Sequence, residues 1–454
     1  MNQLETRTAI SLAAVFAARM LGLFMILPIL PLLAKDLNHS TPFLIGLCVG
    51  IYGLTQAMLQ IPLGMLSDKI GRKPVIIGGL LVFALGSVLA ALSDNIYLII
   101  AARAIQGSGA IAATSMALAA DLSREDHRAK MMAFIGMSIG ASFAIAMVLG
   151  PIISQWGGLS AVFWTTALLA IIGILLITFV VPTPKRTKTH RDVGIMKAYI
   201  KPVLAQSTLL RMNLSVFCLH LLMTANFAVL PLIFRDSLQI DGADHWKIYL
   251  PVLFASIVFS LPMIIIAEKF RKSKLCFIIA VSLLLLSQIA MSFLDYHLLV
   301  PLLFSFLLFF IGFNFLEAMQ PSLVAKYSDV SAKGTAMGVY STSQFLGIFI
   351  GGALGGFVLQ NWGISAVFIL GICIALLFLI IAISLPKPDF FKSKLAKIND
   401  EFLTDIENTR QQLLAVTGIK QAAISAEEGV AYLKIDKLEF NQEDLKRFLA
   451  PLKH

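Results

Sequence analysis

Long apolar runs alternate with short polar segments through the first 385 residues of the chain. Each run has roughly 20 residues or more, the length that an α-helix needs to cross a bilayer. None shows the two-residue alternation typical of a membrane-barrel strand. We therefore expect twelve membrane-spanning helices, at about 8–34, 42–66, 74–93, 96–119, 130–153, 160–182, 208–235, 246–268, 274–294, 297–324, 333–359 and 362–385.

Along the chain, polar segments rich in Lys and Arg alternate with polar segments that have few of them. One set, which includes 69–73, 124–130, 185–201 and 269–274, holds about 19 Lys and Arg residues, whereas the other holds about three. Basic loops stay on the cytoplasmic side of a membrane. We therefore expect both termini and the segment 183–207 to be cytoplasmic.

The chain also repeats itself at a long interval. The segment Gln155-Trp156-Gly157-Gly158 ends one Gly-rich run, and Asn361-Trp362-Gly363 ends another about 205 residues later. Parallel repeats of this kind are one known plan of secondary transporters. The repeat predicts two six-helix halves, 1–182 and 208–386, joined by a linker at 183–207.

The region after residue 386 changes character. Residues 389–398 alternate weakly, 400–417 have the spacing of an amphipathic helix, 419–425 and 430–435 resemble strands, and 441–449 have a second helical pattern. The order βαββα predicts a small ferredoxin-like α+β domain over 387–454. It has no Cys-x-x-Cys pair, so we expect no metal there.

Composition supports the membrane class. The 454 residues are 58% hydrophobic and 14% charged, with a mean hydropathy of +0.85, which is too apolar for a soluble chain of this length. The net charge of +10 is explained by topology and contact with anionic lipid on the cytoplasmic side, so nucleic acid is not an expected partner. The four cysteines all lie in apolar runs without metal-ligand spacing, and no cofactor motif is present.

A charged segment between the second and third runs carries the most specific pattern. Residues 64–74 read Gly-Met-Leu-Ser-Asp-Lys-Ile-Gly-Arg-Lys-Pro. This G-x-L-x-D-x-x-G-R-K pattern resembles the loop between helices 2 and 3 of the major facilitator superfamily of secondary transporters. With the twelve runs and the repeat, the resemblance covers residues 8–385. It implies an all-α polytopic fold with twelve transmembrane helices in two halves, to which the C-terminal domain is added.

The resemblance also implies a conformational latch on the cytoplasmic face. In the superfamily the aspartate of this loop caps helix 11 in one conformation, and the arginine pairs with an acid at the end of helix 4. The corresponding residues here are Asp68, Arg72 and Asp121, and the candidate latch comprises Gly64, Asp68, Gly71, Arg72, Asp121, Arg124 and Arg128. The alternative is a solvated loop needed only for topology.

Three side chains are candidates for proton coupling. Arg103 lies in Arg103-Ala104-Ile105-Gln106-Gly107-Ser108-Gly109, which resembles a helix-4 motif linked to proton coupling in antiporters; the alternative is a packing arginine. Glu317 lies among Phe309, Phe310, Phe313 and Phe315, where we expect it to be buried, and it is the best candidate proton carrier. His220 is the third candidate, although a lone intramembrane histidine is often only structural.

Other polar and aromatic residues within the runs are candidates for lining a substrate cavity between the halves: Arg19, Phe24, Gln56, Gln60, Asn226, Asn314, Tyr340 and Gln344. We expect Gly107, Gly109, Gly136 and Gly140 to be helix-packing positions.

The segments Arg19–Gly22 and Gly334–Ser341, with the C-terminal domain, resemble one bacterial inner-membrane branch of the superfamily. The resemblance implies an inner-membrane exporter and does not give a substrate. The candidate cavity residues are mostly aromatic and amide side chains with few charges, which favours a small amphiphilic or neutral compound. We therefore expect a non-enzymatic, proton-coupled exporter of such a compound. The C-terminal domain is then a regulatory module and a candidate for binding a ligand or protein. Two alternatives stay open, an uncoupled facilitator and a non-transporting sensor.

Overall fold

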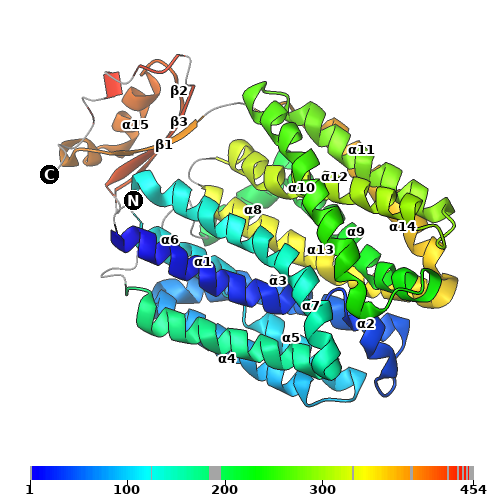
Figure 1. The fold of residues 1–454 in the computed structure, drawn as a ribbon. Helices are drawn as coiled ribbons and strands as arrows, with labels where there is room; N and C mark the ends of the chain where they lie inside the picture. Colours follow the sequence, from blue (N-terminus) through cyan, green and yellow to red (C-terminus); the bar gives the residue numbers. More distant parts are fainter. Residues whose placement is uncertain are drawn as a thin grey trace.

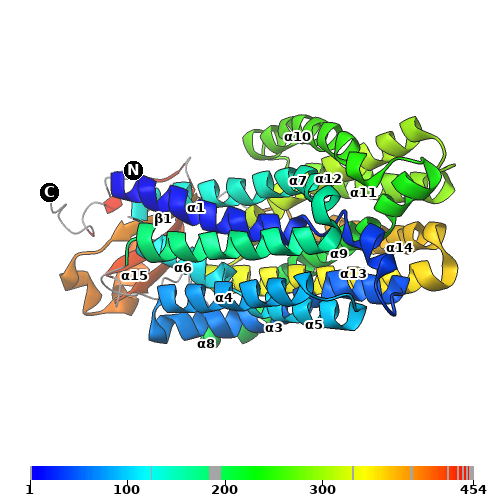
Figure 2. The same cartoon turned by 60° about the horizontal axis from the view of Figure 1, so that its bottom comes forward.

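The computed structural model describes residues 3–123, 125–183, 196–329, 332–388, 392–426, 429–436, 439–441, 444–445 and 448. Figure 1 shows a bundle of long helices with a small sheet at one end, where both chain termini also lie. We call this end of the bundle the terminal end and the other the opposite end. Helices from the two halves of the chain run side by side between the two ends (Figures 1 and 2).

The first half of the chain consists of long helices with two interruptions. Its elements are α1 (Gln3–Phe24), α2 (Leu30–Leu33), a 3₁₀ turn (Ala34–Asp36), α3 (Pro42–Ile70), α4 (Arg72–Ala91), α5 (Ile96–Ser108), α6 (Ala112–Asp121), α7 (Glu125–Leu175) and a π-helical turn (Leu176–Val180).

The second half repeats this plan. It contains α8 (Lys197–Ala205) in the linker region, α9 (Ser207–Leu232), a π-helical turn (Ile233–Ser237), a 3₁₀ turn (Gly242–Asp244), α10 (Trp246–Lys269), α11 (Ser273–Phe293), α12 (Leu299–Tyr327), α13 (Lys333–Trp362) and α14 (Ile364–Ser384).

The predicted fold is confirmed. Among the described residues, eleven helical segments are long and apolar enough to span a membrane, and one of them, Phe134–Val180, has 47 residues, enough for two crossings. Its direction changes at Gly157 and Gly158, and Gly158 has a φ of +62° that favours glycine. Gly363, with a φ of +80°, separates α13 from α14 at the corresponding place of the second half.

Two predicted spans are less regular than expected. The span predicted at 8–34 is helical to Phe24, and its regular helix resumes at Leu30, because Pro28 and Pro31 lack the N–H group that a continuous helix requires. The span predicted at 96–119 is divided into α5 and α6. The break begins at Gly109, which packs against Gly79 of α4.

Glycines allow close contact between the halves. A Cβ atom on Gly50 of α3 would lie 2.6 Å from the carbonyl oxygen of Phe349 in α13, and one on Gly352 would lie 2.5 Å from that of Gly46. Gly107 and Gly109 also meet backbone atoms of neighbouring helices, as expected. The prediction for Gly136 and Gly140 is wrong, because nothing lies within 4 Å of a Cβ atom at either position.

Polar contacts join the halves at the opposite end. Lys35 lies 3.4 Å from Asp236, Arg235 donates to the carbonyl oxygen of Leu32 (3.3 Å), and the amide N–H of Phe43 donates to Gln360 (3.1 Å). Nearer the terminal end, Gln60 of α3 donates to Thr342 of α13 (3.0 Å). The described structure is therefore closed at the opposite end.

The C-terminal domain contains an antiparallel sheet in the order β1-β3-β2, with β1 (Lys392–Lys397), β2 (Ile419–Ser425) and β3 (Val430–Ile435). The helix predicted at 400–417 is shorter: a 3₁₀ turn (Asp400–Leu403) precedes α15 (Ile406–Leu414), which Asp405 caps. Leu413 of α15 belongs to the same buried apolar cluster as Ala431, Leu433 and Ile435 of β3. Most of the helix predicted at 441–449 lies outside the described residues.

Candidate functional site

Three polar side chains from three helices of the second half meet near the middle of the bundle. The His220 ring (Nε2) of α9 lies 3.5 Å from a carboxylate oxygen of Glu317 in α12, and Gln344 of α13 lies 2.8 Å from the same ring nitrogen. The Gln344 amide also donates to Glu317 at 3.4 Å. We call these three residues the midplane cluster.

The expectation that Glu317 is buried is wrong, because its side chain is 41% exposed whereas that of His220 is 4% exposed. Phe313 lies one helical turn before Glu317 on the same face of α12. Its ring centroid is 6.4 Å from that of Phe143, in α7 of the first half. Glu317 therefore lies on the face of α12 that meets the other half at Phe313.

Aromatic rings surround the midplane cluster. Phe143 contacts Phe24 of α1 (5.1 Å between centroids), Phe227 of α9 (6.4 Å) and Phe310 of α12 (6.2 Å), so one ring of the first half is inserted among rings of the second. Phe313 contacts the His220 ring edge-on at 5.9 Å. This arrangement provides an apolar wall next to a half-exposed carboxylate.

Two buried arginines share a tyrosine in the first half. Arg19 donates through Nη2 to the hydroxyl of Tyr52 (2.9 Å), to Gln56 (2.7 Å) and to the carbonyl oxygen of Gly109 (3.1 Å). The guanidinium of Arg103 lies 4.9 Å from the centre of the Tyr52 ring. Both arginines are 1% exposed.

No described carboxylate lies within ion-pair distance of either Arg19 or Arg103. Among the described residues, no hydrogen-bond partner is present for the Nε and Nη1 atoms of Arg19 or for the Nε2 atom of Gln56. A buried cation without a counterion is costly in a membrane. The interior of the first half is therefore rich in positive charge and in hydrogen-bond donors.

The candidate latch residues that the structure describes lie together at the terminal end. Arg72 contacts Asp68 (2.5 Å), Asp121 (3.1 Å) and the hydroxyl of Ser67 (2.7 Å), which in turn donates to the carbonyl oxygen of Gly64 (2.6 Å). The side chains of Arg72 and Asp121 are 2% and 0% exposed.

The turn that places Arg72 depends on Gly71, whose φ of +98° favours glycine. These contacts all lie within the first half, and they are present while the opposite end is closed. Arg124 lies outside the described residues, and the Arg128 side chain is likewise not described.

The other candidate cavity residues are distributed over several places. Gln60 bridges α3 and α13, Asn314 donates to Ser256 (2.8 Å), and Tyr340 donates to Gln320 (3.2 Å). Asn226 is 2% exposed. The structure does not bring Arg103 to Glu317 and His220, because its contacts are with Gln106, Cys48 and Tyr52 of the first half.

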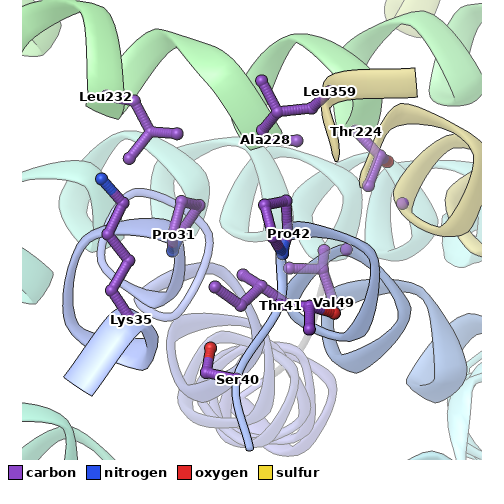
Figure 3. Close-up of a pocket in the computed structure, with 13 residues that line it drawn as sticks. Pro31, Lys35, Ser40, Thr41, Pro42, Val49, Thr224, Ala228, Leu232 and Leu359 are labelled. Atoms are coloured by element: carbon purple, nitrogen blue, oxygen red, sulfur yellow. The ribbon is translucent and has the colours of Figure 1, made fainter. Parts of the chain in front are cut away.

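A cavity between the halves lies at the opposite end, where sequence analysis did not predict one. It has a volume of about 200 Å³, and its walls include Pro31, Pro42, Val49, Ala228, Leu232 and Leu359. Figure 3 shows Leu232, Ala228 and Leu359 of the second half on one side and Ser40 of the first half on the other, with the Lys35 side chain reaching toward Leu232. The apolar residues that line it look like ordinary helix-packing residues in the sequence, so no local pattern distinguishes them.

In the part of the chain that the structure describes, no group of three or more His, Cys, Asp or Glu residues comes together as a metal site would require.

Comparisons with known proteins agree with this geometry. The family model of the Major Facilitator Superfamily matches residues 12–213 and 212–426. The chain is 45% identical to the inner membrane transport protein YajR of Escherichia coli over 443 residues, 98% of this chain and 97% of that protein. This confirms the branch that the Arg19–Gly22 and Gly334–Ser341 segments suggested. An uncharacterized transporter of Buchnera aphidicola, BU466, is 39% identical over 77% of this chain and 90% of its own.

Solved structures support the fold independently. A bacterial homologue of the human lysosomal transporter Spinster, in an inward-facing and occupied conformation, matches with a TM-score of 0.67 and 12% identity over 84% of this chain and 97% of that one. With the family match across most of the chain, the twelve crossings and the 45% identity to a full-length transporter, the chain is a multi-pass membrane transporter that belongs to the Major Facilitator Superfamily.

Proposed function

We propose that this transporter is a proton-coupled exporter that moves a small amphiphilic or neutral compound across the bacterial inner membrane by alternating access. The observation that carries the proposal is the half-exposed Glu317, held by His220 and Gln344 on a face directed at the other half. A carboxylate at this place changes its surroundings whenever the halves move relative to each other.

In this mechanism, protonation of Glu317 changes the relative free energy of the two conformations. With the opposite end closed, the carboxylate has an exposed side, where it can gain or lose a proton. When the terminal end closes, that exposed surface becomes covered, which favours the neutral form. The Gln344 amide orients the carboxylate, and the imidazole of His220 provides a nearby proton acceptor.

The latch contributes to the same equilibrium from the terminal end. The buried Arg72 fixes Asp68 and Asp121, and Asp68 is proposed to cap the first turn of α13 when the terminal end closes. A carboxylate at a helix N-terminus is worth roughly 0.3–1 kcal/mol, enough to bias two conformations without locking either. Since the contacts of Arg72 are internal to the first half, they preorganise Asp68 in both conformations.

The terminal end is proposed to face the cytoplasm, because it carries the basic loops, including Lys69, Lys73, Lys269, Arg271 and Lys272. This orientation places both termini in the cytoplasm and the cluster of basic side chains against anionic lipid. Export then runs from the terminal end to the opposite end.

The C-terminal domain is proposed to regulate transport through α12. Lys434 in β3 is 5% exposed, and its ammonium donates to the carbonyl oxygens of Lys326 (2.7 Å) and Ser328 (2.6 Å), at the C-terminal end of α12. A cation at this end of a helix is stabilised by the helix dipole. Because α12 also carries Glu317, movement of the docked domain acts on the helix that holds the proposed proton carrier.

Proton movement in inside-out membrane vesicles tests the proposal. The vesicle interior is acidified, a pH-sensitive dye reports the gradient, and a panel of amphiphilic and neutral compounds is added to wild type, Glu317→Gln and Glu268→Gln. Glu268→Gln is the control, because it replaces a glutamate by glutamine at the end of α10, where Glu268 pairs with Lys326. We expect some compound to dissipate the gradient in wild type and Glu268→Gln but not in Glu317→Gln.

Other outcomes identify the alternatives. Compound uptake that needs neither a gradient nor Glu317 would make the protein an uncoupled facilitator. If no compound moves and removal of residues 389–454 abolishes a cellular response to one, the protein is a sensor.

A further inference from the structure

Two helices, α9 and α13, contribute residues both to the midplane cluster and to the cavity at the opposite end. On α9, residues 220, 224, 228 and 232 recur every four positions and share one face. His220 belongs to the midplane cluster, and Thr224, Ala228 and Leu232 line the cavity. On α13, Gln344 of the cluster and Gly352 and Leu359 of the cavity follow the same face.

Both halves of the chain contribute to the cavity. Pro31, Lys35 and the segment from Ser40 to Val49 come from the first half, and α9 and α13 from the second. It therefore lies where the halves meet at their closed end, directly beyond the midplane cluster. A molecule that leaves the cluster toward the opposite end must pass through this space.

The walls of the cavity define what it can hold. They are mostly apolar, and the volume of about 200 Å³ is below the roughly 300–1,000 Å³ of sites for drug-sized molecules. The occupant must therefore be compact and largely apolar, of the size of a substituted benzene ring.

Two polar groups line the cavity at different places, and Figure 3 shows the ammonium of Lys35 beside Leu232 and the hydroxyl of Ser40 well away from it. The hydroxyl of Ser40 is buried without a hydrogen-bond partner among the described residues. Among the described residues, the ammonium of Lys35 contacts Asp236 at 3.4 Å, and the carboxylate of Asp236 is also held by Arg235 at 2.6 and 3.1 Å. Lys35 can therefore exchange this long contact for a ligand anion at little cost.

We propose that this cavity is an outer binding site for a compact amphiphilic monocarboxylate, whose carboxylate lies at Lys35 and whose apolar body lies against Ala228, Leu232 and Leu359. The statement that this molecule is the exported compound rests on the proposed function. The existence of the binding site itself is tested separately.

Fluorine NMR on the full-length protein in lipid nanodiscs measures binding directly. The probes are 4-fluorobenzoate and its uncharged counterpart 4-fluorobenzamide. We expect wild type to broaden and shift the 4-fluorobenzoate signal in a saturable manner and to bind the benzamide more weakly. Lys35→Gln should weaken benzoate binding up to about fivefold, since this is the upper end of the range for a partly exposed ion pair, and should leave benzamide binding unchanged.

Matched variants locate the site. Leu232→Trp fills the cavity and should abolish binding. Leu214→Trp is the same change at a position of α9 that is 42% exposed, and it should leave binding intact. Ala228→Leu is a smaller filling change in case Leu232→Trp does not fold, and it should also reduce binding.

Three results would overturn the proposal: no saturable binding of 4-fluorobenzoate, equal binding of the benzoate and the benzamide, or binding that survives both filling variants. Binding that behaves as expected together with no proton movement in vesicles would retain the site and reject the exporter.

Discussion

The contact between α3 and α13 predicts that a single added methyl group will open the closed end. In Gly352→Ala, the new Cβ atom would lie 2.5 Å from the carbonyl oxygen of Gly46 and 2.9 Å from the backbone nitrogen of Gly50. Real Cβ atoms rarely approach within 3.0 Å, and 3.4 Å is an ordinary contact. The two helices must therefore separate locally by roughly 0.5–0.9 Å.

Backbone atoms on both sides cannot turn away as a side chain can, so the overlap has a cost of about 1–3 kcal/mol, the range for overpacked positions. The gain in helix propensity from glycine to alanine is present in both conformations and cancels between them. The population of the conformation closed at the opposite end should then fall by a factor of about 5–150 relative to the other.

Distances between spin labels measure this shift. Labels are attached to Asp94→Cys, between α4 and α5, and Asp295→Cys, between α11 and α12. Both lie at the opposite end in different halves, and both are exposed. The exposed Cys373 is replaced by serine, and the other three cysteines are buried. In nanodiscs, Gly352→Ala should move the distance distribution toward longer values.

Gly78→Ala is the matched control, because nothing lies within 4 Å of its Cβ position and it is also in a membrane helix. It should give the wild-type distribution. If Gly352→Ala gives the same distribution as Gly78→Ala, the contact of α3 with α13 does not control the closed end and the reasoning is refuted.

Three further predictions concern the latch and the C-terminal domain. Arg72→Met removes the cation that lies 3.1 Å from the fully buried carboxylate of Asp121 and should lower the free energy of unfolding by about 3–5 kcal/mol. Thermal unfolding in detergent measures this loss, and addition of Asp121→Asn should restore most of it. A double variant as unstable as the single one would contradict the pairing. Gly71→Ala forces a side chain into a φ of +98° and should cost about 1–2 kcal/mol in the same assay, whereas an unchanged unfolding temperature would show that the turn relaxes freely. Lys434→Met removes the two hydrogen bonds to the end of α12. Amide hydrogen exchange should then increase both in β3 and at residues 326–328. An increase in β3 alone would mean that the domain is destabilised but stays docked on α12.

The sequence by itself determined the twelve crossings and the two related halves. Hydrocarbon excludes unpaired backbone groups, so an apolar run of sufficient length can only be a helix, and this constraint acts locally along the chain. The two strands of the tail, 419–425 and 430–435, agree with β2 and β3 for a similar reason, since turn-forming Gly429 bounds β3. The pairing of Arg72 with Asp121 came from the family pattern of the loop, and the two side chains lie 3.1 Å apart.

Only the tertiary structure decided how far each intramembrane side chain is exposed and which others it meets. Glu317 lies among phenylalanines in the sequence, yet its side chain is 41% exposed, because α9 and α13 cover only one side of it. Arg19 and Arg103, 84 positions apart, share Tyr52, and the cavity at the opposite end combines side chains from α3, α9 and α13. Hydropathy fixes which segments enter the membrane, but within it nearly every helix is apolar on all sides. Contacts between distant segments therefore decide which face meets which neighbour.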